Sequence, residues 1–163
     1  MNKLKGILLT QGMHGMISQV EGLANALDID FTHHTVELNN FWKIIPPKLT
    51  PISQSVYKKV NQFDFDMIIS CGRKSVIPSI HLKNSSKKKV FSIHIQDPKV
   101  NFNNFDFIVA PEHDSIKGQN VINTKGAIHY LTENEIKKNK DYLHSVIKKD
   151  QRKICTLILG GPT

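Results

Sequence analysis

The sequence predicts an α/β fold, a mostly parallel, Rossmann-like sheet with helices on both of its faces. Two observations support this prediction. Short apolar runs of β-forming residues alternate along the chain with segments of helical periodicity, and glycine-containing or polar motifs follow those runs directly. Alternating strands and helices favour parallel strands joined by helical crossovers. Right-handed crossovers then place the carboxyl ends of the strands at one edge of the sheet.

In the first half of the chain, the apolar run 5–10 (KGILLT) predicts a strand, and apolar residues at helical spacing over 16–27 predict a helix. Residues 31–38 (FTHHTVEL) alternate and are rich in β-formers, which indicates a second strand. Three prolines and a tryptophan within residues 39–51 indicate a loop lying over the domain, and a short helix is expected over residues 53–61.

In the second half, residues 66–70 (DMIIS) predict a buried strand, and residues 74–82 suit a helix that tolerates Pro78 near its start. Thr132 and Glu135 match the capping box T-x-x-E and predict a helix to about residue 149. Further strands are expected at residues 89–95, 105–110, 118–124 and 153–159. We therefore expect a Rossmann-like domain over residues 1–150, and the first strand and glycine turn of a missing second domain over 151–163.

The net charge of +8 favours an anionic partner such as a membrane surface or nucleic acid. Composition explains the charge as well, because the chain has 20 Lys and only 2 Arg, as AT-rich coding produces, and the lysines are spread along it. We favour solvated surface lysines and keep peripheral contact with the inner membrane as the alternative. No nucleic acid partner is expected, because neither an RNA-recognition aromatic strand nor a DNA-reading helix is evident.

Membrane-spanning and secreted classes are not favoured. No apolar run approaches the roughly 20 residues that cross a bilayer, and residues 1–10 lack the design of a signal peptide. A cytoplasmic protein is expected. Cys71 and Cys155 lie far apart in apolar runs without metal-site or disulfide spacing, which predicts buried free thiols and no bound metal.

Five motifs are expected to meet at the carboxyl edge of the sheet, where open α/β sheets bind ligands. They are QGMHG at residues 11–15, SCGR at 70–73, HIQDP at 94–98, PEHD at 111–114 and GGPT at 160–163. Each motif alone is a weak signal, and their shared position after strands makes them candidates for one binding rim.

Glycines in two of these motifs are ligand-binding candidates. Gly12 and Gly15 frame the first strand-to-helix turn, where glycine permits close backbone approach and a helix N-terminus favours an anion. A plain turn is the alternative, because G-M-H-G is not the full dinucleotide fingerprint. Gly160 and Gly161 resemble the start of a phosphate-binding turn, which a helix should follow, and the chain is therefore expected to be truncated.

Arg73 is a candidate because this chain nearly always uses lysine as its cation. The planar fork of arginine matches a carboxylate or a phosphate, which lysine cannot copy. Its expected partner is a ligand phosphate or an internal acid such as Asp97 or Glu112, and we favour the internal pair.

The remaining candidates are titratable or polar groups of the same rim. Asp97, Glu112 and His14 are catalytic candidates, as groups able to do general acid/base work. His94, Gln96, His113 and Asp114 are ligand-binding candidates, with a structural hydrogen-bonding role the favoured alternative for His94. If residues 112–114 are extended, Glu112 and Asp114 share one side and His113 faces the other.

These motifs resemble one family. HGMISQVEGLANAL, SCGRKSVIPSI, FSIHIQDPKVNFNNFDFIVAPEHD, GQNVINTKGAIHYLT and LILGGPT look like the bacterial relatives of the plant mitochondrial-fission protein called "elongated mitochondria". The resemblance covers nearly the whole chain, and IHIQDP and PEHD are its specific segments. Members of that family continue well past GGPT.

The resemblance implies a GT-B-like architecture, in which two Rossmann-like domains face each other across a cleft, and a glycosyltransferase-like protein without an established activity. It implies that this chain is the acceptor half, that its partner is the missing C-terminal half or a separate chain, and that the full-length protein uses a nucleotide-sugar donor rather than a tightly bound cofactor. The alternatives are a non-catalytic interaction module in membrane or division-related assembly and a degraded gene product.

Overall fold

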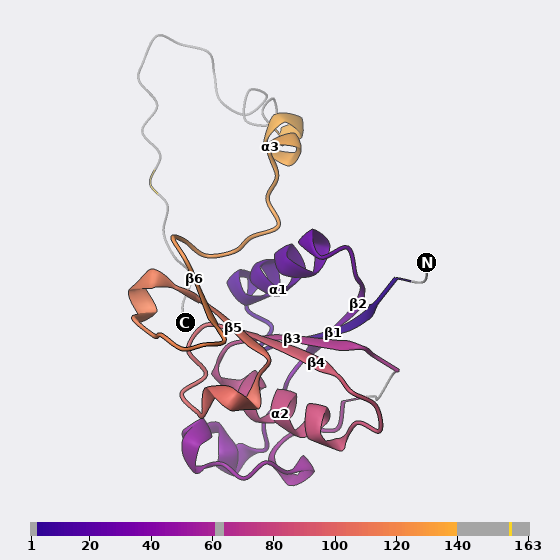
Figure 1. Cartoon of the computed structure of the whole chain (residues 1–163), viewed down its shortest axis with the longest axis vertical. Helices are drawn as coiled ribbons and strands as arrows, with labels where there is room; N and C mark the ends of the chain where they lie inside the picture. The colour runs from indigo at the N-terminus through magenta and orange to yellow at the C-terminus, as the bar shows by residue number, and fades with distance from the viewer. Residues whose placement is uncertain (1–2, 61–63, 140–156, 158–163) are drawn as a thin grey trace. The chain divides into compact units, whose positions relative to one another are not determined.

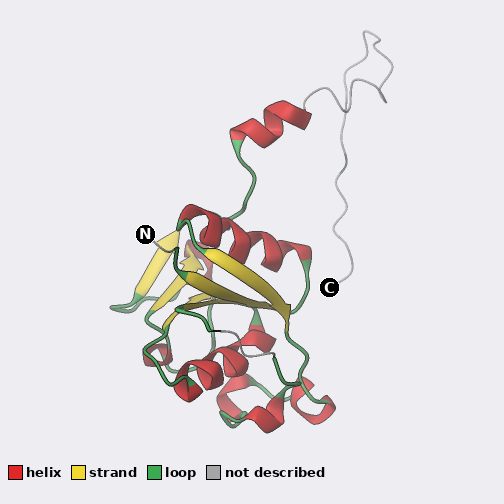
Figure 2. Ribbon diagram, turned by 90° about the vertical axis from the view of Figure 1, so that its right-hand side faces the viewer, coloured by secondary structure: helices red, strands yellow, loops and turns green. Residues whose placement is uncertain are grey.

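The protein forms a six-stranded, all-parallel sheet, described by a computed structural model over residues 3–60, 64–139 and 157. The sheet has the order β2-β1-β3-β4-β5-β6 and lies within one compact unit, residues 1–130. Helices α1 (His14–Ala26) and α2 (Val76–Ser85) cover opposite faces (Figure 1, Figure 2). The strands are β1 (Lys5–Thr10), β2 (Asp30–Thr35), β3 (Met67–Cys71), β4 (Phe91–Ile95), β5 (Phe107–Pro111) and β6 (Val121–Thr124). The predicted Rossmann-like α/β fold is confirmed.

The two faces of the sheet are apolar because the strand side chains alternate between them. Ile7 and Leu9 of β1 belong to the core under α2, together with Ile80 of that helix. Leu8 belongs to the core under α1, together with Val20. A sheet buried on both faces has few polar strand positions, which is why the strands appear in the sequence as near-continuous apolar runs.

Helix α2 begins with a 3-10 turn, η4 (Arg73–Ser75), that joins it to β3. The Ser75 hydroxyl donates to the carbonyl oxygens of Cys71 at 2.9 Å and Gly72 at 2.7 Å. Pro78 lies in the first turn of α2, where its missing N–H costs no intrahelical hydrogen bond. The predicted helix over 74–82 is thus confirmed, shifted by a few residues. Cys71 is a buried free thiol as predicted, and burial raises its pKa to about 12; Cys155 lies outside the described residues.

The segment between β2 and β3 differs from the prediction. The strand expected over 31–38 leaves the sheet after Thr35, and Leu38 instead forms an antiparallel bridge with Tyr57. Because Tyr57 is extended and buried in this bridge, the predicted helix over 53–61 is wrong in its described part. The described part of this segment contains the 3-10 turns η1 (Asn40–Lys43), η2 (Pro47–Leu49) and η3 (Gln54–Val56). The Tyr57 hydroxyl lies 2.8 Å from Nδ1 of His81, which fastens the segment to α2.

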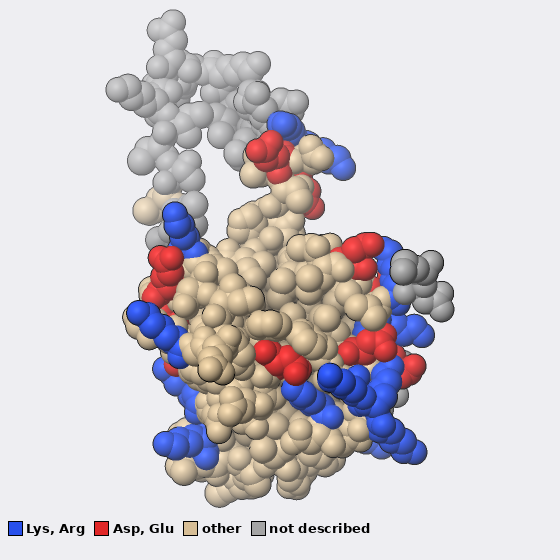
Figure 3. Space-filling view, in the orientation of Figure 1, with Lys and Arg blue, Asp and Glu red and all other residues tan. Residues whose placement is uncertain are grey.

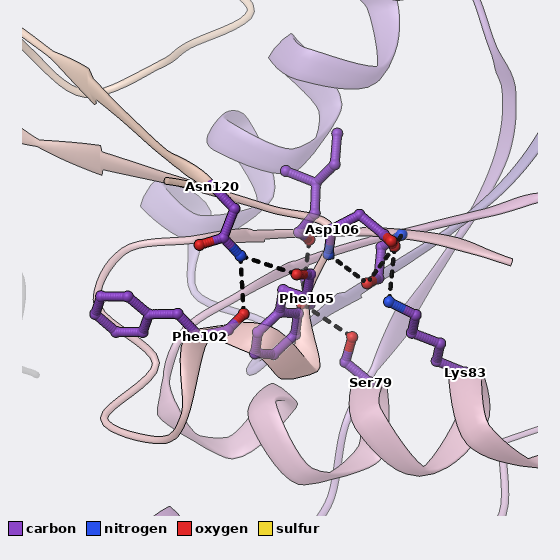
Figure 4. Close-up of polar contacts among 9 residues, drawn as sticks. Ser79, Lys83, Phe102, Phe105, Asp106 and Asn120 are labelled. Carbon is purple, nitrogen blue, oxygen red and sulfur yellow. Dashed lines mark hydrogen bonds and ion pairs between the residues drawn. The ribbon is translucent and has the colours of Figure 1, made fainter. Parts of the chain in front are cut away.

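Side chains before β5 hold it in register with β4 (Figure 4). The carboxylate of Asp106 accepts hydrogen bonds from Lys83 Nζ at 2.7 Å, from the Ser92 amide at 2.7 Å and from the Ser92 hydroxyl at 3.0 Å. Burial raises the pKa of Asp106, but these bonds outweigh it and the pKa is lowered overall. Asn120 donates to the carbonyl oxygens of Phe102 and Phe105, each at 2.9 Å, which ties the turn η5 (Phe102–Asn104) to the start of β6.

Residues 131–163 form a second unit, of which α3 (Glu133–Asn139) is the described helix. The predicted capping box is present: the Glu135 amide donates to Thr132 Oγ1 at 3.3 Å, and the Thr132 amide donates to Glu135 Oε2 at 3.1 Å. The expected continuation of this helix, the strand over 153–159 and the domain boundary at 150/151 lie outside the described residues and stay predictions. No helix in the described part of the chain is long and apolar enough to cross a bilayer.

Candidate functional site

Four of the five predicted motifs lie at the carboxyl ends of β1, β3, β4 and β5, as the parallel topology requires. The fifth, with Gly160 and Gly161, lies outside the described residues. Positive φ angles occur at this edge: 85° at Gly12, 89° at Gly72, 82° at Gln96 and 54° at Ser115. Glycine adopts such angles freely, whereas for Gln96 they are sterically costly. The turn after β4 is therefore held by its surroundings in a conformation that its sequence disfavours.

Four of the predicted residues come together with one further residue at the ends of β4 and β5. Gln96, Asp97, Lys99, His113 and Asp114 line an open depression of about 520 Å³. The Gln96 amide donates to the Val109 carbonyl at 2.8 Å and so continues the bonding between the two strands into the turn. Each strand delivers one carboxylate to the depression.

Asp97 is the more enclosed of the two acids, with 13% of its side chain exposed. Its Oδ1 accepts a hydrogen bond from the Lys99 amide at 2.9 Å, and its Oδ2 lies 2.5 Å from Lys99 Nζ. Burial raises the pKa of Asp97, but the hydrogen bonds and charge of Lys99 outweigh it, so that the pKa is lowered overall. Asp97 is therefore an ionised hydrogen-bond acceptor at neutral pH.

Asp114 belongs to the 3-10 turn η6 (Glu112–Asp114), which directly follows β5. Its Oδ2 accepts a hydrogen bond from the Asp97 amide at 3.3 Å, and its Oδ1 lies 3.6 Å from His113 Nε2. The alternating arrangement expected for residues 112–114 is wrong, because a 3-10 turn does not place successive side chains on opposite sides as a strand does. His113 and Asp114 accordingly line the same depression, and Glu112 is exposed beside it.

The ends of β1 and β3 form a second, tightly packed part of the edge. A Cβ atom at Gly72 would lie 2.5 Å from Gln11 Nε2 and 2.6 Å from Met16 Sδ and would displace the ends of these two side chains, and the φ of 89° also favours glycine there. Gly15, in the first turn of α1, has open space around it, and the helix has no side-chain cap at its N-terminus. His14 is exposed as the first residue of that helix and is not among the residues of the depression.

Arg73 contacts main-chain carbonyls instead of an acid. Its Nη2 donates to the carbonyl oxygens of Lys43 at 2.6 Å and Ile45 at 3.2 Å. The favoured prediction that Arg73 pairs with Asp97 or Glu112 is therefore wrong, because neither acid is among the partners of Arg73 in the described part of the chain. Carbonyl oxygens of a turn cannot all be satisfied within the turn, and the guanidinium, with five donors, supplies the missing hydrogen bonds.

His94 lies beneath the edge and is buried, with 1% of its surface exposed. Its Nδ1 is 2.9 Å from Ser70 Oγ, and its ring lies 5.0 Å from that of Phe105. Burial lowers the pKa of His94 to about 3, although the charge of Asp97 opposes the shift. This is the structural hydrogen-bonding geometry of a neutral imidazole, and it places no atom of His94 in the depression.

Lys99 is the member of the site that sequence reasoning did not single out. The signal that could have found it is the Asp97-Pro98-Lys99 run, because Asp often accepts a hydrogen bond from the amide two residues later. A smaller depression of about 330 Å³ lies at the opposite edge, around the starts of β1 and β2, and is lined by residues such as Lys5, Gly6 and Asp30. It contains none of the predicted motifs. No three His, Cys, Asp or Glu side chains gather as metal ligands within the described ranges.

Comparison with known proteins gives one family and one curated relative. The family model described as "Mitochondrial fission ELM1" matches residues 14–163. Mitochondrial fission protein ELM1 of Arabidopsis thaliana is 31% identical over 48 residues. That aligned segment makes up 29% of this chain and 11% of the plant protein, so the match spans well under two thirds of the relative's length. No solved structure matches the chain.

Proposed function

Starting from the fact that this chain belongs to the Mitochondrial fission ELM1 family, we propose that it is the acceptor-side unit of a GT-B-type, glycosyltransferase-like protein. The single observation that supports the proposal most is the depression at the ends of β4 and β5, with Asp97 and Asp114 in its lining. It lies at the edge of a parallel sheet where α/β proteins bind ligands.

The chemistry of the lining suits a hydroxyl-rich acceptor. Carboxylates accept hydrogen bonds from hydroxyl groups, and the side-chain amide of Gln96 can both donate and accept hydrogen bonds. Lys99 holds Asp97 in the ionised form that a general base requires, and the same ion pair lowers the basicity of the carboxylate. In the proposed step, the acceptor oxygen attacks the anomeric carbon of a nucleotide-sugar donor. The bond to the nucleoside diphosphate breaks, the diphosphate leaves with its electron pair, and the acceptor proton passes to Asp97.

The donor is a substrate in this proposal and not a tightly bound cofactor. The second domain of a GT-B architecture would present it to the carboxyl edge of this unit. The uncapped N-terminus of α1 and the open space at Gly15 lie at the same edge and leave room for the donor's phosphates.

The first experiment measures binding of methyl glycosides and of nucleotide sugars to the full chain by chemical-shift perturbation and thermal shift. We expect Asp97→Asn and Asp114→Asn each to weaken glycoside binding at least about tenfold, as loss of a charge-assisted hydrogen bond does. Asp28→Asn is the matched control, because Asp28 also pairs with a lysine, Lys3, but is exposed and follows α1 at the other end of the helix.

The proposal is overturned if the folded protein binds no member of either ligand set. It is equally overturned if a glycoside binds and neither rim variant changes its affinity more than Asp28→Asn does.

A second candidate function, a non-catalytic interaction module, is favoured by a different observation. Several large apolar side chains are exposed on the segment between β2 and β3. The Arabidopsis relative is named as a mitochondrial fission protein. An interaction module would use this exposed segment and would tolerate Asp97→Asn and Asp114→Asn.

A further inference from the structure

Four large apolar side chains point into solvent from one short segment of the protein. Phe41, Ile44, Leu49 and Ile52 are exposed to 67%, 80%, 73% and 45% of their surface. Single exposed apolar residues are ordinary, but a concentration of this kind within one segment marks an interaction site. We call these four side chains the apolar tip.

The local fold presents the apolar tip outward. Residues three apart share one side of a 3-10 turn. Phe41 and Ile44 have this spacing in and after η1 and are exposed, whereas Trp42 and Ile45, with the same spacing, are half-buried. Around η2 the pattern recurs: Pro47 and Thr50 are buried, whereas Leu49 and Ile52 are exposed. Around each of the two turns, some side chains pack inward and two large apolar side chains are exposed to solvent.

Contacts with the rest of the unit hold the segment in this conformation. Arg73 binds the Lys43 and Ile45 carbonyls, and the Asn39 side chain donates to the Ser55 carbonyl at 2.6 Å. The Thr50 hydroxyl donates to the Pro46 carbonyl at 2.9 Å. The apolar tip is thus preorganised, which lowers the entropy cost of binding through it.

The charged side chains within the segment that carries the apolar tip are all basic. Residues 38–60 contain no acidic residue and carry four exposed lysines: Lys43, Lys48, Lys58 and Lys59. Lys58 is neutralised by Glu37 outside this range, and the guanidinium of Arg73 lies at the base of the segment. Figure 3 shows no acidic side chain on the lowest part of the visible face, where Figure 1 draws the 3-10 turns between β2 and β3.

We propose that the apolar tip docks onto an anionic phospholipid bilayer. Apolar side chains that enter the region between headgroups and acyl chains, flanked by lysines that reach the headgroup phosphates, are the chemistry of interfacial membrane binding. The absence of acids over residues 38–60 removes the repulsion that an anionic surface would otherwise meet. The proposal rests on the apolar tip and its charge and is independent of the acceptor site.

Vesicle co-sedimentation of the full chain tests it. We expect binding to vesicles of phosphatidylcholine with phosphatidylglycerol, much weaker binding to phosphatidylcholine alone, and a decline with salt. The double variant Phe41→Ser/Ile44→Ser should weaken binding at least tenfold, and Lys43→Gln or Lys48→Gln roughly fivefold each. Circular dichroism should show all these variants folded, because the changed side chains are exposed.

Two matched controls distinguish docking through the apolar tip from non-specific adsorption to vesicles. Ile122→Ser removes an apolar side chain, 49% exposed, from β6. Lys87→Gln/Lys89→Gln removes two exposed lysines from the turn before β4. Both should leave vesicle binding within about twofold of the unaltered protein.

Three results would overturn the proposal. One is no binding to anionic vesicles by the folded protein, and another is equal weakening by the controls and the tip variants. The third is a dimer, detected by sedimentation equilibrium, that becomes a monomer in Phe41→Ser/Ile44→Ser while that variant still binds vesicles. This result would show that the apolar tip binds a second copy of the chain. If the apolar tip instead recognises an acidic protein, anionic vesicles will fail to bind, and the first of these results will be seen.

Discussion

The main-chain amide of Asp97 donates a hydrogen bond to the carboxylate of Asp114, 3.3 Å away. This contact joins the turn after β4 to η6 after β5 and positions the Asp114 carboxylate against that turn. The residue before Asp97, Gln96, has an unusual φ of +82°. The geometry of the candidate site is therefore maintained at the expense of local strain.

Two substitutions at Gln96 test this strain. Gln96→Gly and Gln96→Ala both remove the side chain, but only glycine adopts φ near +82° without steric cost. We expect the glycine variant to exceed the alanine variant in free energy of unfolding by about 1 kcal/mol, measured by urea denaturation. An alanine variant as stable as the glycine variant would show that the turn carries no strain.

Burial of His94 predicts a pH dependence of stability. Its pKa falls from 6.5 to about 3 on folding, so between these values the unfolded chain binds a proton that the folded protein does not. The contribution to stability is therefore complete above about pH 6.5 and is lost as the pH falls toward 3, at roughly 1 kcal/mol per pH unit. His94→Asn should be less stable at neutral pH, with a shallower decline between about pH 6 and pH 4. Parallel declines for the two proteins would contradict the assignment. His33 and His34, whose pKa values are also lowered by burial, titrate in both proteins and cancel in the comparison.

Gly72 and Gly15 form a matched pair of alanine substitutions at the same edge. At Gly72 the φ of +89° is strained for any residue with a Cβ atom, and such an atom would also displace the ends of the Gln11 and Met16 side chains. We expect Gly72→Ala to lower the free energy of unfolding by at least about 2 kcal/mol. Gly15→Ala lies in a helix with open space around it and should be neutral or stabilising by up to about 1 kcal/mol. Thermal unfolding of the two variants gives the comparison, and equal losses would refute the distinction.

Substitution of Arg73 should loosen the segment that carries the apolar tip. Arg73→Lys keeps the positive charge but not the fork that reaches the Lys43 and Ile45 carbonyls. We expect a loss of about 1 kcal/mol in stability and faster tryptic cleavage after Lys43 and Lys48, followed by mass spectrometry. Lys74→Arg, at the adjacent position, is the control and should leave the cleavage rate unchanged. Unaltered cleavage in Arg73→Lys would show that the guanidinium does not hold the segment.

The order of strands and helices could be predicted from local patterns, because each element depends mainly on neighbours within its own span. The alternation of Ile7, Leu8 and Leu9 between two cores, for example, follows from a strand buried on both faces. The capping box at Thr132 and Glu135 was predictable for the same reason, since both of its hydrogen bonds are local.

Features that depend on distant partners were not predictable. Tyr57 lies in a stretch where a short helix was expected, but it is extended, because it pairs with Leu38. Arg73 was expected to bind an acid, yet its partners are carbonyls of residues some 30 positions earlier in the chain. At the candidate site, the carboxyl-edge location of Asp97 and Asp114 follows from topology alone. The Asp97-Pro98-Lys99 run is a local signal for Lys99, whereas the strained turn at Gln96 depends on its surroundings and has no such signal.

The strand order has a consequence for how the protein folds. No two neighbouring strands of the described sheet are joined as a hairpin, so each pairing must wait for a loop to close. Ile93 pairs with Phe107 and Ile108 with Val121, over short separations, whereas Gly6 pairs with Met67. Closing the longest of these loops costs about 1 kcal/mol more entropy than closing the shortest. We therefore expect β4, β5 and β6 to associate first, and the β1–β3 seam, where Gly72 meets Gln11 and Met16, to be completed late.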